Sequence, residues 1–124
     1  MGRKNEGGKL MVYGEAKRKL EKSARLYLEM RGFLIKEQNW GSGKNKIDLI
    51  AFKAGLIHFI EVNYIKDTLS DTSVDVLTES RLKQIKDAID AWMSENRYTG
   101  QYVFSTLQLS GQEMAVVSFN ESIL

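Results

Sequence analysis

Apolar side chains recur along the chain at two different spacings, which divide it into helical and extended segments. Within 12–31 and again within 77–96, they recur every three or four residues. Such spacing is typical of an amphipathic helix with one buried face. The first stripe consists of Leu20, Ala24, Tyr27 and Leu28, and the second consists of Leu82, Ile85, Ile89 and Trp92.

Extended segments account for most of the remaining chain. A strand begins at Phe33, and the glycine-rich segment 39–45 has the composition of a turn. Two apolar runs, which flank a short turn, predict a β-hairpin, and two further runs follow the second helix. The four runs cover 46–52, 56–65, 102–109 and 114–119, and a polar loop covers 66–76.

The predicted order is α, β, β, β, α, β, β. The economical fold for this order is α/β, a central mixed sheet with a helix on each side. We expect a single domain over 11–124, preceded by a flexible arm over 1–10 that contains Gly7 and Gly8. The strand after Gly100 is expected at an exposed sheet edge, where a second copy could pair to form a homodimer.

The composition excludes several classes of protein. A chain of 124 residues with 43% hydrophobic and 27% charged residues is typical of one globular domain. It has no apolar run long enough to span a membrane, and no signal peptide is recognisable, so a cytoplasmic location is expected. Without cysteine there are no disulfides, thiol nucleophiles or cysteine-ligated zinc sites. The one histidine, His58, precedes Phe59 on its strand, so its side chain points to the face opposite Phe59 and Glu61. This position indicates a role in packing.

The net charge of +2 conceals an uneven distribution. Residues 1–53 contain 13 Lys or Arg and 6 Asp or Glu, a balance of +7, whereas residues 54–124 contain 5 and 10, a balance of −5. This asymmetry suggests a basic face that meets a polyanion. The alternative is a solvated helix that happens to be basic.

Two carboxylates interrupt strands that are otherwise apolar. Asp48 lies in the first strand of the predicted hairpin and Glu61 in the second, so the two side chains can lie close together. A carboxylate in a protein core costs several kcal/mol unless it is paired, hydrogen-bonded or bound to a cation. The pair therefore points to a shared proton or a hard divalent ion, unless each acid lies at a strand end and faces water.

These residues resemble a known pattern. An Asp, a hairpin and then Glu-x-Lys form the core of the PD-(D/E)xK nuclease superfamily, and this chain is most similar to its YraN family of small predicted nucleases. The resemblance covers roughly residues 20–105. The residues that carry it are Glu21 to Leu28, Gly32-Phe33, Asn39-Trp40, Lys46-Ile47-Asp48-Leu49-Ile50-Ala51 and His58-Phe59-Ile60-Glu61-Val62-Asn63.

The resemblance implies a restriction-endonuclease-like αβββαβ core with an acidic cluster of Glu21, Asp48 and Glu61. It implies that Asp48 and Glu61 hold Mg²⁺ or Mn²⁺, which would activate a water molecule against a scissile phosphate. The basic helix and the following loop would bind nucleic acid, with DNA expected, although Trp40 could instead cap the core. The nucleic-acid-binding candidates are Lys17, Arg18, Lys22, Arg25, Trp40 and Lys44.

The chain departs from the family pattern at two positions. Asn63 stands where the family has its catalytic lysine, and Lys46 stands where a glutamate is expected. Since Lys46 and Asp48 are two residues apart on a strand, their side chains share a face, and Lys46 could replace the missing lysine. Otherwise Lys46 is a surface residue. The sequence thus leaves two functions open: a metal-dependent nuclease, or a nuclease-fold module that binds nucleic acid or acts as a scaffold.

Overall fold

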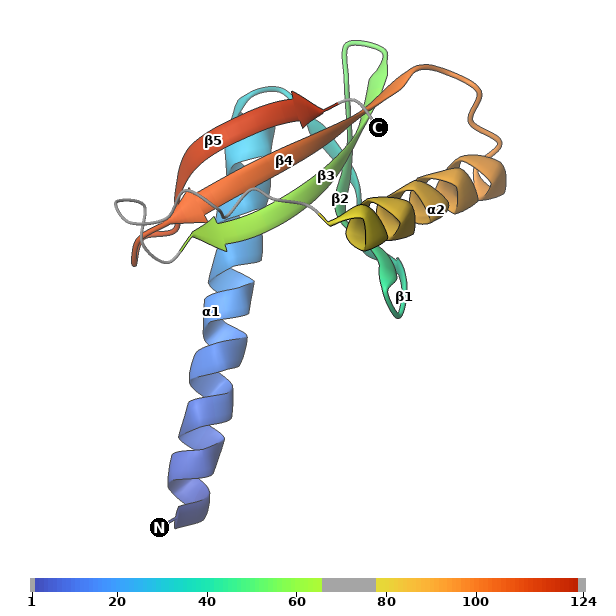
Figure 1. The fold of residues 1–124 in the computed structure, drawn as a ribbon. Coiled ribbons are helices and arrows are strands. Elements are labelled where there is room, and N and C mark those ends of the chain that lie inside the picture. Colours follow the sequence, from blue (N-terminus) through green and yellow to red (C-terminus); the bar gives the residue numbers. More distant parts are fainter. Residues whose placement is uncertain (1, 66–77, 123–124) are drawn as a thin grey trace.

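A computed structural model describes residues 2–65 and 78–122, and its element order is the predicted one (Figure 1). The predicted polar loop at 66–76 lies outside the described residues. The elements are α1 (Gly2–Met30), β1 (Leu34–Ser42), β2 (Asn45–Lys53), β3 (Leu56–Ile65), α2 (Glu79–Glu95), β4 (Tyr102–Ser110) and β5 (Ala115–Ser122).

The five strands form one mixed sheet in the order β1-β2-β3-β4-β5. Only β3 and β4 pair in parallel, and α2 lies in the connection between them, as a parallel crossover requires. The predicted α/β architecture is confirmed, and it is compatible with a restriction-endonuclease-like αβββαβ core. The expectation that the strand after Gly100 is an edge is wrong. Residues of β4 pair with β3 on one side and β5 on the other, because strand order is set by long-range pairing.

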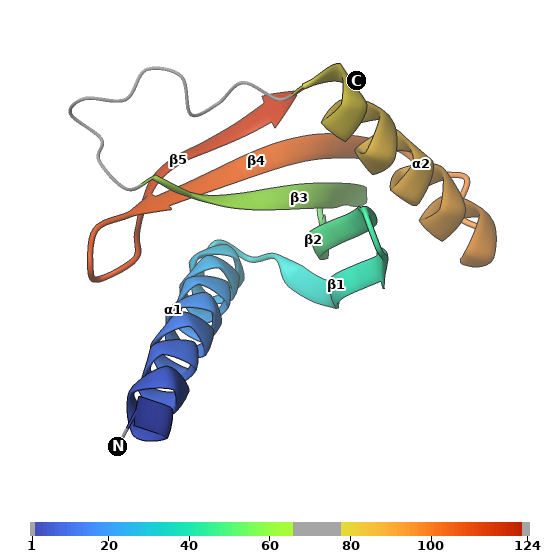
Figure 2. The same ribbon diagram turned by 60° about the horizontal axis from the view of Figure 1, so that its bottom comes forward.

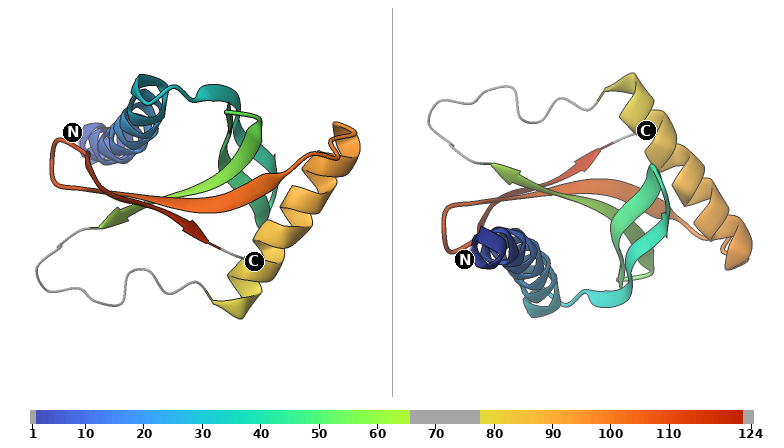
Figure 3. Two further views of the ribbon diagram at one scale, coloured as in Figure 1. Left: turned by 90° about the horizontal axis from the view of Figure 1, so that it is seen from above. Right: turned by 90° about the horizontal axis from the view of Figure 1, so that it is seen from below.

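The helices cover opposite faces of the sheet (Figures 2 and 3). Both predicted helical stripes face the sheet, although Leu82 is only half-buried. In the described part of the chain, neither helix is long and apolar enough to cross a membrane. The core beneath α1 contains Ala24, Leu28, Phe33, Leu49, Ala51, Ile60, Leu107 and Leu109, and the core beneath α2 contains Ile47, Ile50, Ile57, Phe59, Ile85, Ala88, Ile89, Trp92 and Phe104.

Two predicted boundaries are wrong. Helix α1 begins at Gly2 rather than near Val12, because a helix that has started propagates by one backbone hydrogen bond per residue and needs no apolar stripe. The flexibility of the 1–10 arm stays a prediction. Strand β1 continues to Ser42 through the segment predicted as a turn. There Asn39 and Gly41 adopt positive φ within the strand, so turn-forming residues kink it without ending its pairing with β2.

The β1–β2 hairpin depends on Gly41, which has φ of 108°. A Cβ atom at this position would overlap the backbone carbonyl of Asn45. We expect Gly41→Ala to lower the free energy of unfolding by about 2–4 kcal/mol, measured by urea denaturation. Gly55→Ala is the matched control, since its φ is also positive but the space around it is open. It should cost only about 1 kcal/mol. Equal losses in the two variants would contradict the steric argument.

Candidate functional site: a buried acid pair held by an arginine

Asp48 lies where the pairing of β2 with β3 ends. The last backbone pair is Leu49 with Ile60, and one residue further on the Oδ2 atom of Asp48 accepts a hydrogen bond from the backbone N–H of Val62 at 2.7 Å. The carboxylate therefore takes the place of a strand partner. This contact fixes Asp48 beside Glu61, which lies between Ile60 and Val62 on β3, so the two acids are close together as the hairpin predicts.

The position of Asp48 disfavours its ionised form. Burial, together with the neighbouring charge of Glu61, raises the pKa of Asp48 from 3.8 to about 6, although the Val62 N–H and the charge of Arg81 act in the opposite direction. The direction follows from like charges in a poorly solvated site. The structure thus brings Asp48 and Glu61 together, and ionisation of Asp48 is costly there.

Glu61 is bound by an arginine that the sequence analysis did not single out. The Nε and Nη2 atoms of Arg81 donate to the two carboxylate oxygens of Glu61, at 3.0 and 2.8 Å. The side chains are 26% exposed for Arg81 and 12% for Glu61, so this is a largely buried ion pair. Two parallel N–H···O bonds are the strongest geometry available to an arginine and a carboxylate. Each oxygen of Glu61 thereby accepts a hydrogen bond from the same guanidinium.

Arg81 is itself held firmly. Thr78 caps α2 by accepting a hydrogen bond from the Arg81 backbone N–H, which fixes the first helical turn. The remaining guanidinium hydrogens reach the backbone carbonyls of Lys44 and Lys46 and, at 3.4 Å, the side chain of Gln84. All five guanidinium donors therefore have acceptors. The hydrogen bond to Glu61 is the main reason that the pKa of Arg81 is raised.

One sequence signal could have indicated Arg81. The positive end of the helix dipole makes the first turn of a helix favourable for acids and unfavourable for cations. Arg81 lies in that first turn of α2. A cation at such a position is favoured when an anionic partner lies nearby. Glu61 is that acid, because a carboxylate in the predicted core is stabilised by a neighbouring cation.

A small cavity lies between α1 and the sheet, and Asp48 lines it whereas Arg81 does not. It brings together Lys17, Glu21, Lys46 and Asp48, four of the predicted site residues, within a volume of about 160 Å³. Glu21 is oriented by a hydrogen bond of 2.9 Å from the Asn39 side chain. Glu61 does not line this cavity. The predicted acidic cluster is thus divided, with Glu21 and Asp48 in the cavity and Glu61 on Arg81.

The remaining predicted residues do not join this cavity. Trp40 packs against the core beneath α2, as its alternative interpretation required. Arg25 donates to the side chain of Gln38, and Arg18 and Lys22 are exposed on α1. The backbone of Lys44 contacts Arg81, whereas its side chain is exposed. Asn63 is half-buried on β3, two residues beyond Glu61.

The arrangement does not fit a bound Mg²⁺ or Mn²⁺. Asp48, Glu61 and Glu21 offer the oxygen ligands that such ions prefer. However, both oxygens of Glu61 accept hydrogen bonds from Arg81. Among the residues that the structure describes, no three Asp, Glu or His side chains are grouped closely enough to share an ion. The guanidinium supplies the positive charge that an ion would bring.

Comparison with known proteins identifies similar sequences. The model of a family described as "Uncharacterised protein family UPF0102" matches residues 20–117. A UPF0102 protein of Cytophaga hutchinsonii is 31% identical over 96 residues, which is 77% of this chain and 85% of the relative. Another, from Aliarcobacter butzleri, is 34% identical over 83 residues, 66% of this chain and 74% of the relative. A UPF0102 protein of Nitratiruptor is 38% identical over 78 residues, which is 61% of this chain and 65% of the relative.

Replacing Asp48 should stabilise the protein at neutral pH. Because folding raises the pKa of this acid from 3.8 to about 6, the ionised group lowers stability above pH 6, and the penalty disappears as pH falls to about 4. In Asp48→Asn, the amide oxygen still accepts from Val62 and the amide nitrogen can donate to Glu61. We expect a gain of roughly 1–3 kcal/mol in unfolding free energy at pH 7, and little gain at pH 4.

The control is Asp90→Asn, which makes the same chemical change at an exposed position of α2. Its unfolding free energy should stay within about 0.5 kcal/mol of the wild type at both pH values. A loss of stability in Asp48→Asn at pH 7 would show that the charge of Asp48 is favourable in the fold.

Removing the guanidinium should expose the cost of burying Glu61. We expect Arg81→Met to lower the unfolding free energy by about 2–4 kcal/mol in chemical denaturation, since Glu61 and two backbone carbonyls lose their partner. Arg81→Lys should recover only part of this, because an ammonium group cannot form the two-pronged contact. Lys83→Met is the control, since its pair with Asp87 is exposed and should contribute less than about 1 kcal/mol. Similar losses in Arg81→Met and Lys83→Met would contradict a structural role for the buried pair.

Proposed function

Since this chain belongs to the UPF0102 family, the YraN nuclease-like group that its sequence resembles, we propose that it is a nucleic-acid-binding protein with a nuclease fold. In this proposal the acid pair is structural, and binding requires no metal ion. The observation that carries the proposal is the pair of hydrogen bonds from Arg81 to the two oxygens of Glu61. Asn63 agrees with it, because an asparagine brings no charge to the position where the family has a lysine.

A basic ridge on α1 supports the binding of a polyanion. We define this ridge as Lys17, Arg18, Lys22 and Arg25. At about 100° per helical residue, these four side chains fall within roughly 140° of the helix circumference, beginning at the rim of the cavity. Contacts from such side chains to phosphates are largely independent of nucleic-acid sequence and weaken with salt.

The cavity beside the ridge supports the binding of a single phosphate. Its volume of about 160 Å³ is well below the ~300–1,000 Å³ of most small-molecule sites, so a whole nucleotide exceeds it. Lys17 and Lys46 line it together with two acids. Because the pKa of Asp48 is about 6, the cavity becomes more positive as that acid takes up a proton near neutral pH. A backbone phosphate of DNA is the anion that this position favours.

A second candidate is metal-dependent phosphodiester hydrolysis, with Lys46 in place of the family lysine. One observation favours it: Lys46, Asp48 and Glu21 line the same cavity, so the lysine does lie beside the acid. It ranks second because Glu61 would first have to leave Arg81. The two candidates differ in the roles they give to Mg²⁺ and Asp48. The second requires both for cleavage, whereas in the first the metal ion is not needed for binding and Asp48 is structural.

The test measures binding and cleavage of a short DNA duplex by the full chain. We expect binding in the presence of a chelator, with affinity that falls as salt rises. Lys17→Gln should reduce the magnitude of the slope of log K against log salt by about 1. Asp48→Asn should bind more tightly at pH 7, since it removes a negative charge beside the phosphate. Lys86→Gln, on an exposed position of α2, is the control and should match the wild type.

Cleavage is then assayed with Mg²⁺ and with Mn²⁺, and none is expected. Hydrolysis that is lost in both Asp48→Asn and Lys46→Ala would replace the first function with the second. Hydrolysis that survives Lys46→Ala would rule out the lysine replacement. Binding that is equal in the wild type, Lys17→Gln and Asp48→Asn would contradict the phosphate position at the cavity.

A further inference from the structure

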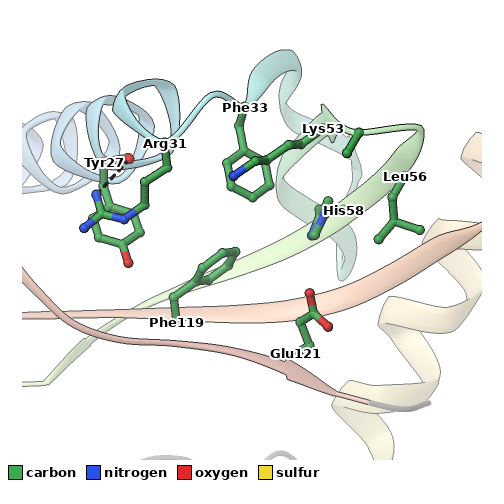
Figure 4. A pocket seen from close by; sticks show the side chains of 9 residues that line it. Tyr27, Arg31, Phe33, Lys53, Leu56, His58, Phe119 and Glu121 are labelled. Carbon is green, nitrogen blue, oxygen red and sulfur yellow. Dashed lines mark hydrogen bonds between the residues drawn. The ribbon is translucent and has the colours of Figure 1, made fainter.

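A second cavity lies at the C-terminal end of α1, beside Tyr27 and Arg31. Neither of the two candidate functions uses it. Its volume is about 480 Å³, within the range of small-molecule sites. It is lined by the end of α1, the β2–β3 turn, β3 and β5 (Figure 4). None of the site residues predicted from the sequence lines it.

Aromatic rings form one wall of this cavity. The ring of Phe119 contacts those of Tyr27 and Phe33 edge to face, with ring centroids 6.1 Å and 5.8 Å apart. The imidazole of His58 continues the wall, 4.8 Å from Phe33. Four ring systems that line an open cavity offer a surface on which a flat, apolar ring can stack.

Two cations lie over these rings. The guanidinium of Arg31 is 3.6 Å from the centre of the Tyr27 ring, and the ammonium of Lys53 is 5.0 Å from the centre of the Phe33 ring. In the described part of the chain, neither cation forms an ion pair. Their charges therefore remain available to an anion that enters from the open side. In Figure 4, Arg31 and Tyr27 lie at one end of the cavity, and Glu121 lies at the other.

A buried polar group adds a second sign of a polar ligand. His58 is 4% exposed, and its Nδ1 atom has no hydrogen-bond partner among the described residues. Buried polar atoms without partners are rare and call for an explanation. Burial lowers the pKa of His58, so its ring is neutral at pH 7 and can both donate and accept hydrogen bonds. Glu121 lies close to this ring and adds a hydrogen-bond acceptor.

From these features together we infer that the cavity binds a nucleoside phosphate. The base stacks on the half-buried ring of Phe119, with its polar edge toward His58 and Glu121. The phosphate lies between Arg31 and Lys53. This arrangement matches the three chemical parts of the cavity: aromatic, polar and cationic.

The same chemistry could come from two sources, a free mononucleotide or the last nucleotide of a strand. The rise of α1 places Tyr27 about 9 Å along the helix from Glu21 of the first cavity, so a strand could reach both cavities. The inference goes beyond the proposed function and does not depend on it, since a free nucleotide needs only the second cavity.

The single histidine of the chain gives a specific readout. The ring C–H signals of His58 are followed by NMR in the full chain while adenosine 5′-monophosphate is added. We expect the chemical shifts of these signals to change and to reach saturation at a few millimolar nucleotide. The affinity should be at least about tenfold above that of adenosine or of inorganic phosphate alone. Arg31→Gln combined with Lys53→Gln should weaken binding about tenfold or more. Lys36→Gln combined with Lys86→Gln removes two exposed charges elsewhere and should leave binding unchanged.

A second titration uses a 5′-phosphorylated tetranucleotide. If it shifts the His58 signals at lower concentration than the mononucleotide, the ligand is the end of a strand. If the mononucleotide binds as tightly or more tightly, the ligand is the free nucleotide. Both results support the inference. Absence of a His58 shift with either probe would overturn it, and so would equal affinity in the wild type and in Arg31→Gln combined with Lys53→Gln.

Discussion

The contact between Arg81 and Glu61 is the interaction on which the rest of the site depends. Two acids lie next to each other where β2 and β3 stop pairing, in a position that water reaches poorly. One of them, Asp48, accepts a hydrogen bond from the Val62 backbone N–H, and its burial beside Glu61 raises its pKa. The other is kept by a guanidinium whose remaining donors hold the start of β2. Without that cation, the crossover helix and the hairpin would face each other across an unpaired buried charge.

This contact also decides how the family resemblance is interpreted. In a metal-dependent nuclease, the cation beside the acids is an ion that can be exchanged and that reacts with water. Here the cation is covalently part of α2, and each of its five N–H groups donates to a protein acceptor. Under the function we propose, Lys17 and Lys46, which line one cavity, recognise a phosphate without a metal ion.

The sequence predicted what depends on local pattern and missed what depends on long-range contacts. The stripe of Ile85 and Ile89, and the adjacency of Asp48 and Glu61, follow from periodicity and from the short hairpin between β2 and β3. Arg81 was missed because it is 20 residues from Glu61 and belongs to another element. The place of β4 inside the sheet, and the strand conformation of Asn39, likewise depend on partners that no local pattern indicates.

We propose that a protein cation, Arg81, takes the place of a metal ion at the acid pair. Calorimetric titration of the wild-type chain with Mn²⁺ and Mg²⁺ at pH 7.5 tests it most directly, with Asp48→Asn titrated in parallel. We expect no saturable heat in either protein up to millimolar concentrations of either ion. Saturable binding of one ion in the wild type, abolished in Asp48→Asn, would contradict it.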